Sequence, residues 1–202
     1  MKHIKRLIDI VFSFLAIIIF SPLFIFISIA IILDSGFPIF YKQKRLGKNY
    51  KEFTLYKFRS MIKNADKIGS LVTSSNDKRI TKVGKFLRKT KLDELPQFFN
   101  VLIGDMSIVG PRPEVEKYAN YYKKDFEYIL SKVKPGITDK ASIQYRNEEK
   151  ILADKEGNHE TLYINELLPK KLKLAKEYAD NNNIIIDLAI ILKTFFVVLF
   201  KH

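Results

Sequence analysis

IVFSFLAIIIFSPLFIFISIAIIL, residues 10–33, decides the architecture of this 202-residue chain. The stretch is apolar except for three serines and one proline, and as a helix it would extend about 36 Å, enough for a hydrocarbon core of roughly 30 Å. The apolar run is too long for the core of a signal peptide, and no small-residue cleavage site follows it. We therefore predict a membrane helix rather than a cleaved signal peptide or a buried soluble helix.

Basic residues flank both ends of this stretch, and they favour the cytoplasmic side of a membrane. Those before it are Lys2, Lys5 and Arg6, and those after it are Lys42, Lys44, Arg45, Lys48 and Lys51. Ser21-Pro22 provides a kink, because proline removes one helical hydrogen bond and a neighbouring serine can satisfy the freed carbonyl. We predict a re-entrant hairpin with arms 10–21 and 22–33, in preference to a straight span.

The predicted organisation is a membrane anchor, residues 1–36, followed by a compact cytoplasmic domain, residues 37–202. Residues 184–200 are apolar but include two charged side chains, which suits a helix lying in the membrane interface or packed on the domain. Residues 53–56 and 107–109 predict strands of a small sheet. The expected fold class is therefore α/β and mostly helical, with a re-entrant membrane helix and amphipathic interfacial helices.

Composition limits the chemistry. The chain has 35 Lys and Arg against 22 Asp and Glu, a formal net charge of +13, which predicts anionic partners such as phosphorylated metabolites, anionic lipids or nucleic acid. It has no cysteine, which removes disulfides, thiolate nucleophiles and cysteine-based zinc sites. Its glycines form neither a dinucleotide-binding fingerprint nor a Walker loop, so side chains would have to bind any phosphate.

An acidic pair ends the basic run of residues 78–97. Asp93 and Glu94 come directly before an apolar segment, 95–103, that predicts a helix, with Pro96 tolerated in its first turn. Asp93 would then lie near a helix N-terminus among basic side chains, where a carboxylate or a phosphate is favoured. The equally weighted alternative is a helix N-cap followed by a first-turn acid, with no catalytic role.

Arg112 lies between two prolines that restrict the backbone on both sides of it. A guanidinium held on a stiff loop suits bidentate contact with a phosphate or carboxylate, although it could instead clamp a loop carbonyl or Glu114. Residues 134–138 predict a turn-forming loop. Residues 146–149 (RNEE) could equally be a solvated helix start.

Taken in order, these motifs resemble the monotopic phosphoglycosyl transferases, a bacterial sugar transferase family that initiates glycan assembly on polyprenyl phosphate. The resemblance covers nearly the whole chain and is closest to the minimal members, which lack extra membrane helices. It is carried by Lys5-Arg6 with Asp9, by Ser21-Pro22, and by residues 56–61 (YKFRSM), 92–102 (LDELPQFFNVL), 104–113 (GDMSIVGPRP) and 134–138 (KPGIT). After Thr138 the chain departs from many members, which continue with Gly-Trp and later Asn-Gly-Arg, so the resemblance leaves the sugar open.

The resemblance implies a transferase in which Asp93 attacks the β-phosphorus of a UDP-sugar, expels UMP and holds the sugar phosphate as an acyl phosphate. Polyprenyl (undecaprenyl) phosphate then accepts the group. Glu94 is implied as the partner carboxylate, and Mg²⁺ as the cofactor with Asp93 as its main protein ligand. The expected phosphate-binding residues are Lys57, Arg59, Arg88, Arg112 and Arg146. The implied setting is the cytoplasmic face of the bacterial inner membrane, with membrane lipid as a partner and a homo-oligomer as an option.

Three alternatives compete with this interpretation. A non-catalytic membrane-anchored basic module could recruit anionic lipid or a protein partner, but it would not explain the order of the motifs. A membrane-tethered nucleic-acid binder is disfavoured because no binding motif is recognisable, so no nucleic acid is expected as a partner. The third keeps the reaction but lets the lipid phosphate attack the donor directly.

Overall fold

The structure, a computed structural model, describes residues 2–73, 77–155 and 157–200 of the chain. Its first element is helix α1, Lys2–Ser35, which continues through Pro22. The Ser21 hydroxyl donates to the Ile18 carbonyl at 2.8 Å, the carbonyl that a helical amide at position 22 would otherwise satisfy. The predicted compensation by serine is therefore confirmed.

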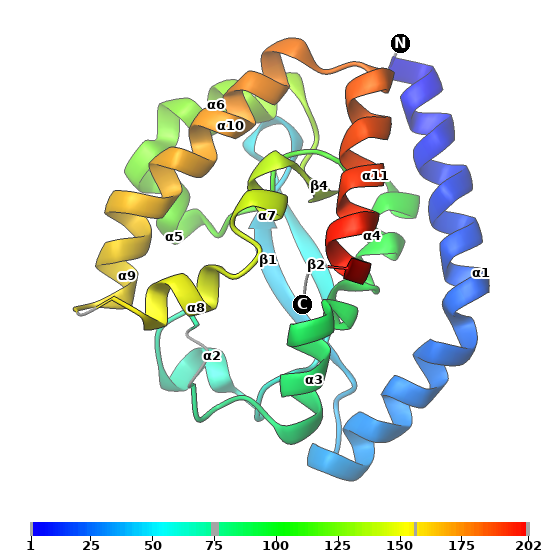
Figure 1. Ribbon diagram of the computed structural model, residues 1–202, viewed down its shortest axis with the longest axis vertical. Coiled ribbons are helices and arrows are strands. Elements are labelled where there is room, and N and C mark those ends of the chain that lie inside the picture. The colour runs from blue at the N-terminus through cyan, green and yellow to red at the C-terminus, as the bar shows by residue number, and fades with distance from the viewer. Residues whose placement is uncertain (1, 74–76, 156, 201–202) are drawn as a thin grey trace.

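Helix α1 lies along one side of the molecule and bends in its second half toward α3, Lys82–Thr90 (Figure 1). The two arms do not fold back on each other as a tight hairpin, because the helix continues through the proline. Among the described residues, α1 is the one helix long and apolar enough to cross a membrane. Many of its apolar side chains are exposed, as Phe26 at 70% and Ile19 at 67% illustrate.

Two small sheets replace the single sheet expected from the sequence. Strand β1, Phe40–Leu46, pairs antiparallel with β2, Glu52–Phe58. Strand β3, Ser107–Val109, pairs parallel with β4, Gly136–Thr138. Both predicted strands are confirmed, but they belong to different sheets, and part of the predicted turn at 134–138 is a strand.

A pair of glycines explains the second sheet. A Cβ added to Gly136 would lie 2.1 Å from the amide nitrogen of Gly110, well inside van der Waals contact. Only a residue without a side chain lets these two segments approach so closely. The strand pairing of β3 and β4 therefore depends on residues that in the sequence look like turn formers.

Short and longer helices account for most of the other described residues, and loops connect them. In chain order they are η1 Lys48–Tyr50, α2 Ala65–Ile68, α3, η2 Leu92–Glu94, α4 Gln97–Ile103, α5 Glu116–Ala119, η3 Asn120–Tyr122, α6 Lys123–Lys132, α7 Lys140–Gln144, α8 Glu148–Ala153, α9 His159–Leu162, η4 Tyr163–Leu167, α10 Leu168–Asn181 and α11 Ile184–Phe200. In Figure 1, α6 and α10 lie on one side of the central strands, and α1 and α11 on the other.

Polar groups fasten α1 to the domain. The Arg6 guanidinium donates to the Val101 and Leu102 carbonyls near the end of α4, at 2.5 and 2.8 Å. The buried Asp9 carboxylate accepts from the Ile108 amide of β3 at 3.0 Å. Cations at a helix C-terminus satisfy carbonyls that lack partners within the helix. The basic residues before the apolar stretch therefore dock the helix as well as flank it.

The C-terminal helix α11 packs on the domain through Asp187 and Ile190, which are both buried. The Asp187 carboxylate accepts from Lys5 of α1 and from the Tyr178 hydroxyl of α10, each at 2.6 Å. The opposite face of α11 exposes large apolar side chains, namely Ile185, Leu188, Leu192, Phe195, Phe196 and Phe200. Of the two arrangements expected for residues 184–200, packing on the domain is observed.

Candidate active site

The acidic pair lies in a short turn between two helices. Helix α3 ends at Thr90, and Lys91 has the left-handed backbone angle φ of 60° that reverses the chain into η2, which contains Asp93 and Glu94. The N-cap of α4 is Pro96, and no side chain caps that helix. The alternative that Asp93 is an N-cap is therefore wrong, and its carboxylate is available for other interactions.

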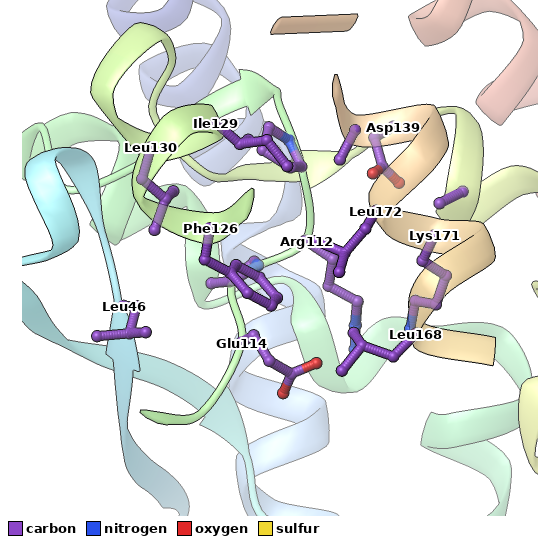
Figure 2. A pocket seen from close by; sticks show the side chains of 14 residues that line it. Leu46, Arg112, Glu114, Phe126, Ile129, Leu130, Asp139, Leu168, Lys171 and Leu172 are labelled. Atoms are coloured by element: carbon purple, nitrogen blue, oxygen red, sulfur yellow. The ribbon is translucent and has the colours of Figure 1, made fainter. Parts of the chain in front are cut away.

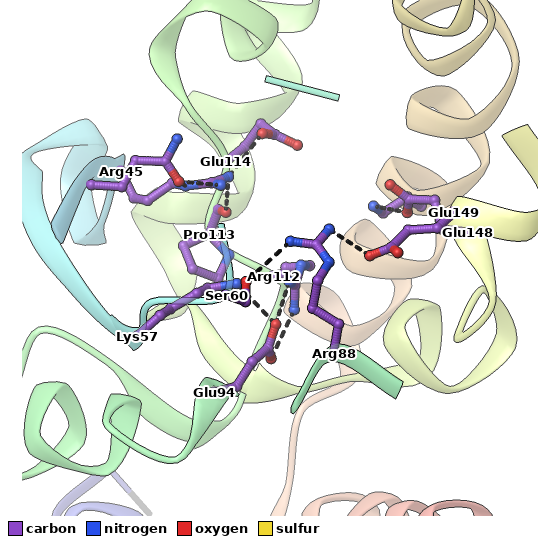
Figure 3. A network of polar contacts seen from close by, with 12 residues as sticks. Arg45, Lys57, Ser60, Arg88, Glu94, Arg112, Pro113, Glu114, Glu148 and Glu149 are labelled. Atoms are coloured by element: carbon purple, nitrogen blue, oxygen red, sulfur yellow. Dashed lines mark hydrogen bonds and ion pairs between the residues drawn. The ribbon is translucent and has the colours of Figure 1, made fainter. Parts of the chain in front are cut away.

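Glu94 is held by two cations from distant segments. Arg112 donates from both terminal nitrogens to the two carboxylate oxygens, at 2.6 and 3.1 Å, and Lys57 Nζ donates to Oε1 at 2.9 Å (Figure 3). Burial by itself would raise the pKa of the Glu94 carboxyl, but Arg112 and Lys57 outweigh it and hold the pKa well below its usual range. Glu94 is therefore an ionised, fully engaged carboxylate, and the bidentate contact expected of Arg112 is made here to a carboxylate.

Asp93, unlike Glu94, has a carboxylate oxygen that no cation or other donor among the described residues contacts. Asp93 is 6% exposed, and its Oδ1 is buried with no hydrogen-bond partner. Burial and the neighbouring Glu94 charge raise the pKa of the Asp93 carboxyl, while Lys57 and Arg88 oppose the rise. A buried oxygen without a partner is costly unless a bound group satisfies it. Asp93 is therefore the side chain of the pair that is free to react.

A cavity of about 530 Å³ opens in front of Asp93. This volume is within the range of pockets that enclose small ligands. Basic side chains from separate elements line it, and they are Lys42, Arg45, Lys57, Arg59, Lys63, Arg79, Arg88, Arg112 and Lys171. The cavity can therefore receive an anionic ligand with its charged part close to an unpartnered carboxylate.

A second cavity, of about 30 Å³, lies behind the Arg112 loop (Figure 2). Apolar side chains such as Phe126 and Ile129 form most of its walls, and Arg112 and Glu114 line both cavities. Its volume is enough for about one water molecule. The loop that carries Arg112 thus separates the large cavity from the apolar core.

Arg88 approaches Asp93 from α3. Its Nη2 donates to Glu149 of α8 at 2.6 Å, its Nη1 lies 3.5 Å from the Ser60 hydroxyl, and its Nε is buried without a partner. Three of the predicted phosphate-binding residues, Lys57, Arg88 and Arg112, therefore meet around the acidic pair (Figure 3).

The other two predicted residues have different surroundings. Arg59 lines the cavity, but its Nη2 donates to the Ser35 hydroxyl and the Gly36 carbonyl, at 2.8 and 2.6 Å, and so holds the end of α1. Arg146 donates to the Val197 carbonyl of α11 and, among the residues that the structure describes, is not part of the cavity wall. Its role in binding phosphate stays a prediction, while Glu148 and Glu149, two and three residues further along the chain, line the cavity.

Several cavity residues escaped prediction. Glu148 accepts from Lys171 of α10 at 2.7 Å, and Glu149 accepts from Arg88, so the helix start at these residues is observed, and its acids are ion-paired and only partly exposed. The sequence does contain a feature that could have marked Glu148 and Glu149. They are adjacent acids in a strongly basic chain, and they follow the point where the chain departs from the family pattern. No local signal marks Lys171 of α10, which lines the cavity and forms an ion pair with Glu148 of α8.

The acidic side chains around Asp93 determine whether a metal ion could bind there. Among the described residues, no group of three or more His, Cys, Asp or Glu side chains could hold a metal ion. Mg²⁺ needs fewer protein ligands than that, since it commonly binds through one or two carboxylates plus substrate phosphates and waters. The unpartnered oxygen of Asp93 fits this mode, whereas the Glu94 carboxylate is already bound to two cations.

Comparison with known proteins supports a single family. A family model described as bacterial sugar transferase matches residues 1–201. A UDP-glucose:undecaprenyl-phosphate glucose-1-phosphate transferase of Escherichia coli is 40% identical over 199 residues, 96% of this chain and 40% of the relative. A UDP-N-acetylgalactosamine-undecaprenyl-phosphate N-acetylgalactosaminephosphotransferase of Aeromonas hydrophila is 42% identical over 142 residues, 69% of this chain and 34% of the relative.

A shorter relative matches along most of its length. An uncharacterized sugar transferase of Bacillus subtilis is 37% identical over 191 residues, 95% of this chain and 85% of the relative. By contrast, the chain spans well under half the length of the Escherichia coli and Aeromonas hydrophila proteins. The similarity to those two is therefore a similarity to part of each protein.

Proposed function

The chain belongs to the bacterial sugar transferase family, and we propose that it transfers a sugar 1-phosphate from a UDP-sugar to polyprenyl phosphate with release of UMP. The observation that carries this proposal is the buried Asp93 oxygen without a partner, at the edge of a basic cavity of about 530 Å³. The names of the relatives support it, because they specify UDP-sugars as donors and undecaprenyl phosphate as the acceptor.

In the first step, an oxygen of the ionised Asp93 carboxylate forms a bond to the β-phosphorus of the donor. The bond between that phosphorus and the bridging oxygen breaks, and its electron pair leaves with UMP. Lys57, Arg88 and Arg112 stabilise the charge that develops on the phosphoryl oxygens. The burial that raises the pKa of Asp93 also strips water from its carboxylate, which makes the ionised form a stronger nucleophile.

In the second step, an oxygen of polyprenyl phosphate attacks the same phosphorus. The bond to Asp93 breaks, the carboxylate is restored, and the sugar remains joined to the lipid through a diphosphate. A covalent intermediate predicts that protein incubated with its UDP-sugar, without polyprenyl phosphate, gains the mass of one phosphosugar. Direct attack by the lipid phosphate would leave the protein mass unchanged under these conditions.

Mg²⁺ belongs to the same proposal, with Asp93 as its protein ligand. When bound, the ion would neutralise part of the diphosphate charge. The supporting observation is the free carboxylate oxygen beside cations that are already engaged by Glu94 and Glu149. Chelation should abolish UMP release and Mg²⁺ should restore it, while Ca²⁺, a larger ion with looser geometry, should restore less.

The membrane arrangement is also proposed: α1 enters and leaves the cytoplasmic leaflet of the bacterial inner membrane. Exposed apolar side chains on the bent helix, and basic residues near both of its ends, support this arrangement. Because the chain has no cysteine, single cysteines at Lys2 and Lys44 can be labelled from one side of sealed vesicles. Both should react from the cytoplasmic side, whereas a straight span would expose them on opposite sides.

The test of the activity is UMP release by the full chain in nanodiscs with Mg²⁺, undecaprenyl phosphate and a panel of UDP-sugars. Asp93→Asn keeps the size of the side chain and removes the nucleophilic charge, so it should lower turnover about a thousandfold or more. The matched control is Asp154→Asn, an exposed aspartate outside the cavity lining. Equal turnover by Asp93→Asn and wild type would refute the mechanism.

A further inference from the structure

Two carboxylates face the large cavity from the side of α8. Glu148 and Glu149 both line it, and both make ion pairs across it, to Lys171 at 2.7 Å and to Arg88 at 2.6 Å (Figure 3). Their side chains retain 28% and 31% exposure, so neither is sealed within the protein. The reaction proposed above has no role for either of them.

The carboxylates of Glu148 and Glu149 are unsuited to binding a diphosphate. Carboxylates repel phosphate oxygens, and the repulsion is strong inside a cavity of low dielectric constant. An ionised carboxylate is instead a strong acceptor for hydroxyl and amide N–H donors, with bonds shorter and stronger than those to a neutral acceptor. Lys171 adds a donor beside them. The set matches a polyhydroxylated ring better than it matches a phosphate.

The position of Glu148 and Glu149 indicates that they lie near the transferred sugar and not near the ribose. Arg88 lies close enough to Asp93 to stabilise its ionised form, and the same guanidinium binds Glu149. In the proposed reaction the sugar is one oxygen away from the phosphorus that Asp93 attacks, so its ring must lie near these residues. The ribose is separated from that phosphorus by the whole of the leaving α-phosphate, and so lies farther away.

The unpartnered Asp93 oxygen provides an independent observation that a ligand belongs in this cavity. Asp93 is 6% exposed, its Oδ1 has no partner, and it lines the same cavity as the α8 acids. A ligand beside Asp93 therefore lies in the same cavity as Arg88 and the carboxylate that binds it.

From this arrangement we infer that Glu148 and Glu149, with Lys171, recognise the hydroxyl and amide groups of the sugar ring and select the donor. The inference rests on the proposed function and deepens it, since it names the part of the substrate that α8 reads. It also gives a physical role to the region after Thr138, where the chain departs from many members of the family it resembles.

The experiment compares wild type with Glu148→Gln and Glu149→Gln, which preserve side-chain size and remove the charge. UMP release is measured with UDP-glucose, UDP-galactose and UDP-N-acetylgalactosamine. The affinity for UDP, which has the ribose and the diphosphate but not the transferred sugar, is measured by calorimetry. Glu177→Gln, at an exposed position of α10, is the matched control. Thermal unfolding of each variant by circular dichroism separates loss of recognition from loss of folding.

We expect kcat/KM for the best donor to fall about 10- to 100-fold in each variant, because a hydrogen bond to a charged group contributes about 1.5–3 kcal/mol. The preference among the three donors should shrink, as expected when a polar contact to the substrate is removed. UDP should bind at least as tightly as to wild type, because a carboxylate that repels phosphate is gone.

Two results would overturn the inference while wild type remains active. A parallel rise in UDP affinity and in kcat/KM for every donor would mean that the acids only compete with phosphate for Arg88 and Lys171. An equal fall for every donor would mean that they only position those cations. The absence of UMP release by wild type with any donor would instead refute the proposed function, and the inference with it.

Discussion

Glu94→Gln tests whether the carboxylate of Glu94 holds two cations together. Lys57 Nζ and Arg112 Nη2 contact the same oxygen, Oε1, at 2.9 and 2.6 Å, so the two nitrogens are at most about 5.5 Å apart. At that separation and an effective dielectric constant of 20, their repulsion is about 3 kcal/mol. Glutamine leaves this repulsion without compensation.

At neutral pH the free energy of unfolding of Glu94→Gln should be about 3 kcal/mol lower than that of wild type. For a chain of this size, such a loss lowers Tm by about 6–12 °C. Thermal unfolding followed by circular dichroism in nanodiscs measures it, with Glu116→Gln, an exposed glutamate on α5, as the control. The double variant Glu94→Gln, Lys57→Met removes one of the two cations, so it should recover most of the loss.

The loss should also depend on pH. Burial already lowers the pKa of Lys57, and Glu94 opposes that shift, so the substitution lowers the pKa further. The folded state then binds fewer protons than the unfolded state, and stability rises with pH toward the ordinary lysine pKa of about 10.4. A Tm within 2 °C of wild type at pH 7, or a double variant less stable than Glu94→Gln, would refute the reasoning.

Three further predictions concern the site and the fold. Because burial and Glu94 raise the pKa of Asp93, kcat/KM should fall with decreasing pH from a higher pH than an ordinary aspartate would give, and Glu94→Gln should move this acid limb downward; an unmoved limb in the pH profile would exclude Asp93 as the titrating group. Gly136→Ala should lower the free energy of unfolding by about 3 kcal/mol or more, since its Cβ would lie 2.1 Å from the backbone of Gly110. Gly69→Ala is the control, because the nearest atom there belongs to the flexible Arg79 side chain, at 3.1 Å; similar Tm values for the two variants would contradict this. Asp187→Asn should cost about 2–3 kcal/mol, because Lys5 loses its buried counter-ion, and the added change Lys5→Met should restore part of the Tm; no recovery would argue against the ion pair.

The long apolar helix α1 could be predicted because its signal is local. A long apolar stretch needs no distant partner to form a helix, and the serine before Pro22 satisfies a carbonyl only three residues away. The same holds for Asp93 and Glu94, whose place between a basic run and an apolar helix is visible in the sequence. Family resemblance then supplied the roles that local chemistry left open.

Strand pairing was less predictable, because its cause is not local. Strands at 53–56 and 107–109 were expected, but nothing near them indicates that they pair with 40–46 and 136–138, respectively. The close approach of Gly110 and Gly136 selects the second pairing. A glycine in sequence predicts a turn as readily as it predicts a close contact between two backbones.

The site shows the same division. The sequence by itself determined a long apolar helix, a basic domain and an aspartate beside a second acid, since each depends on the side chains of one short stretch. Only the tertiary structure decided which cation meets which carboxylate: Lys57 and Arg112 meet Glu94, and Arg88 meets Glu149, across separations of 37, 18 and 61 residues. The physical reason is that charges act through space over a few ångströms, so the free oxygen of Asp93 and the acids of α8 acquire their surroundings only when distant helices pack together.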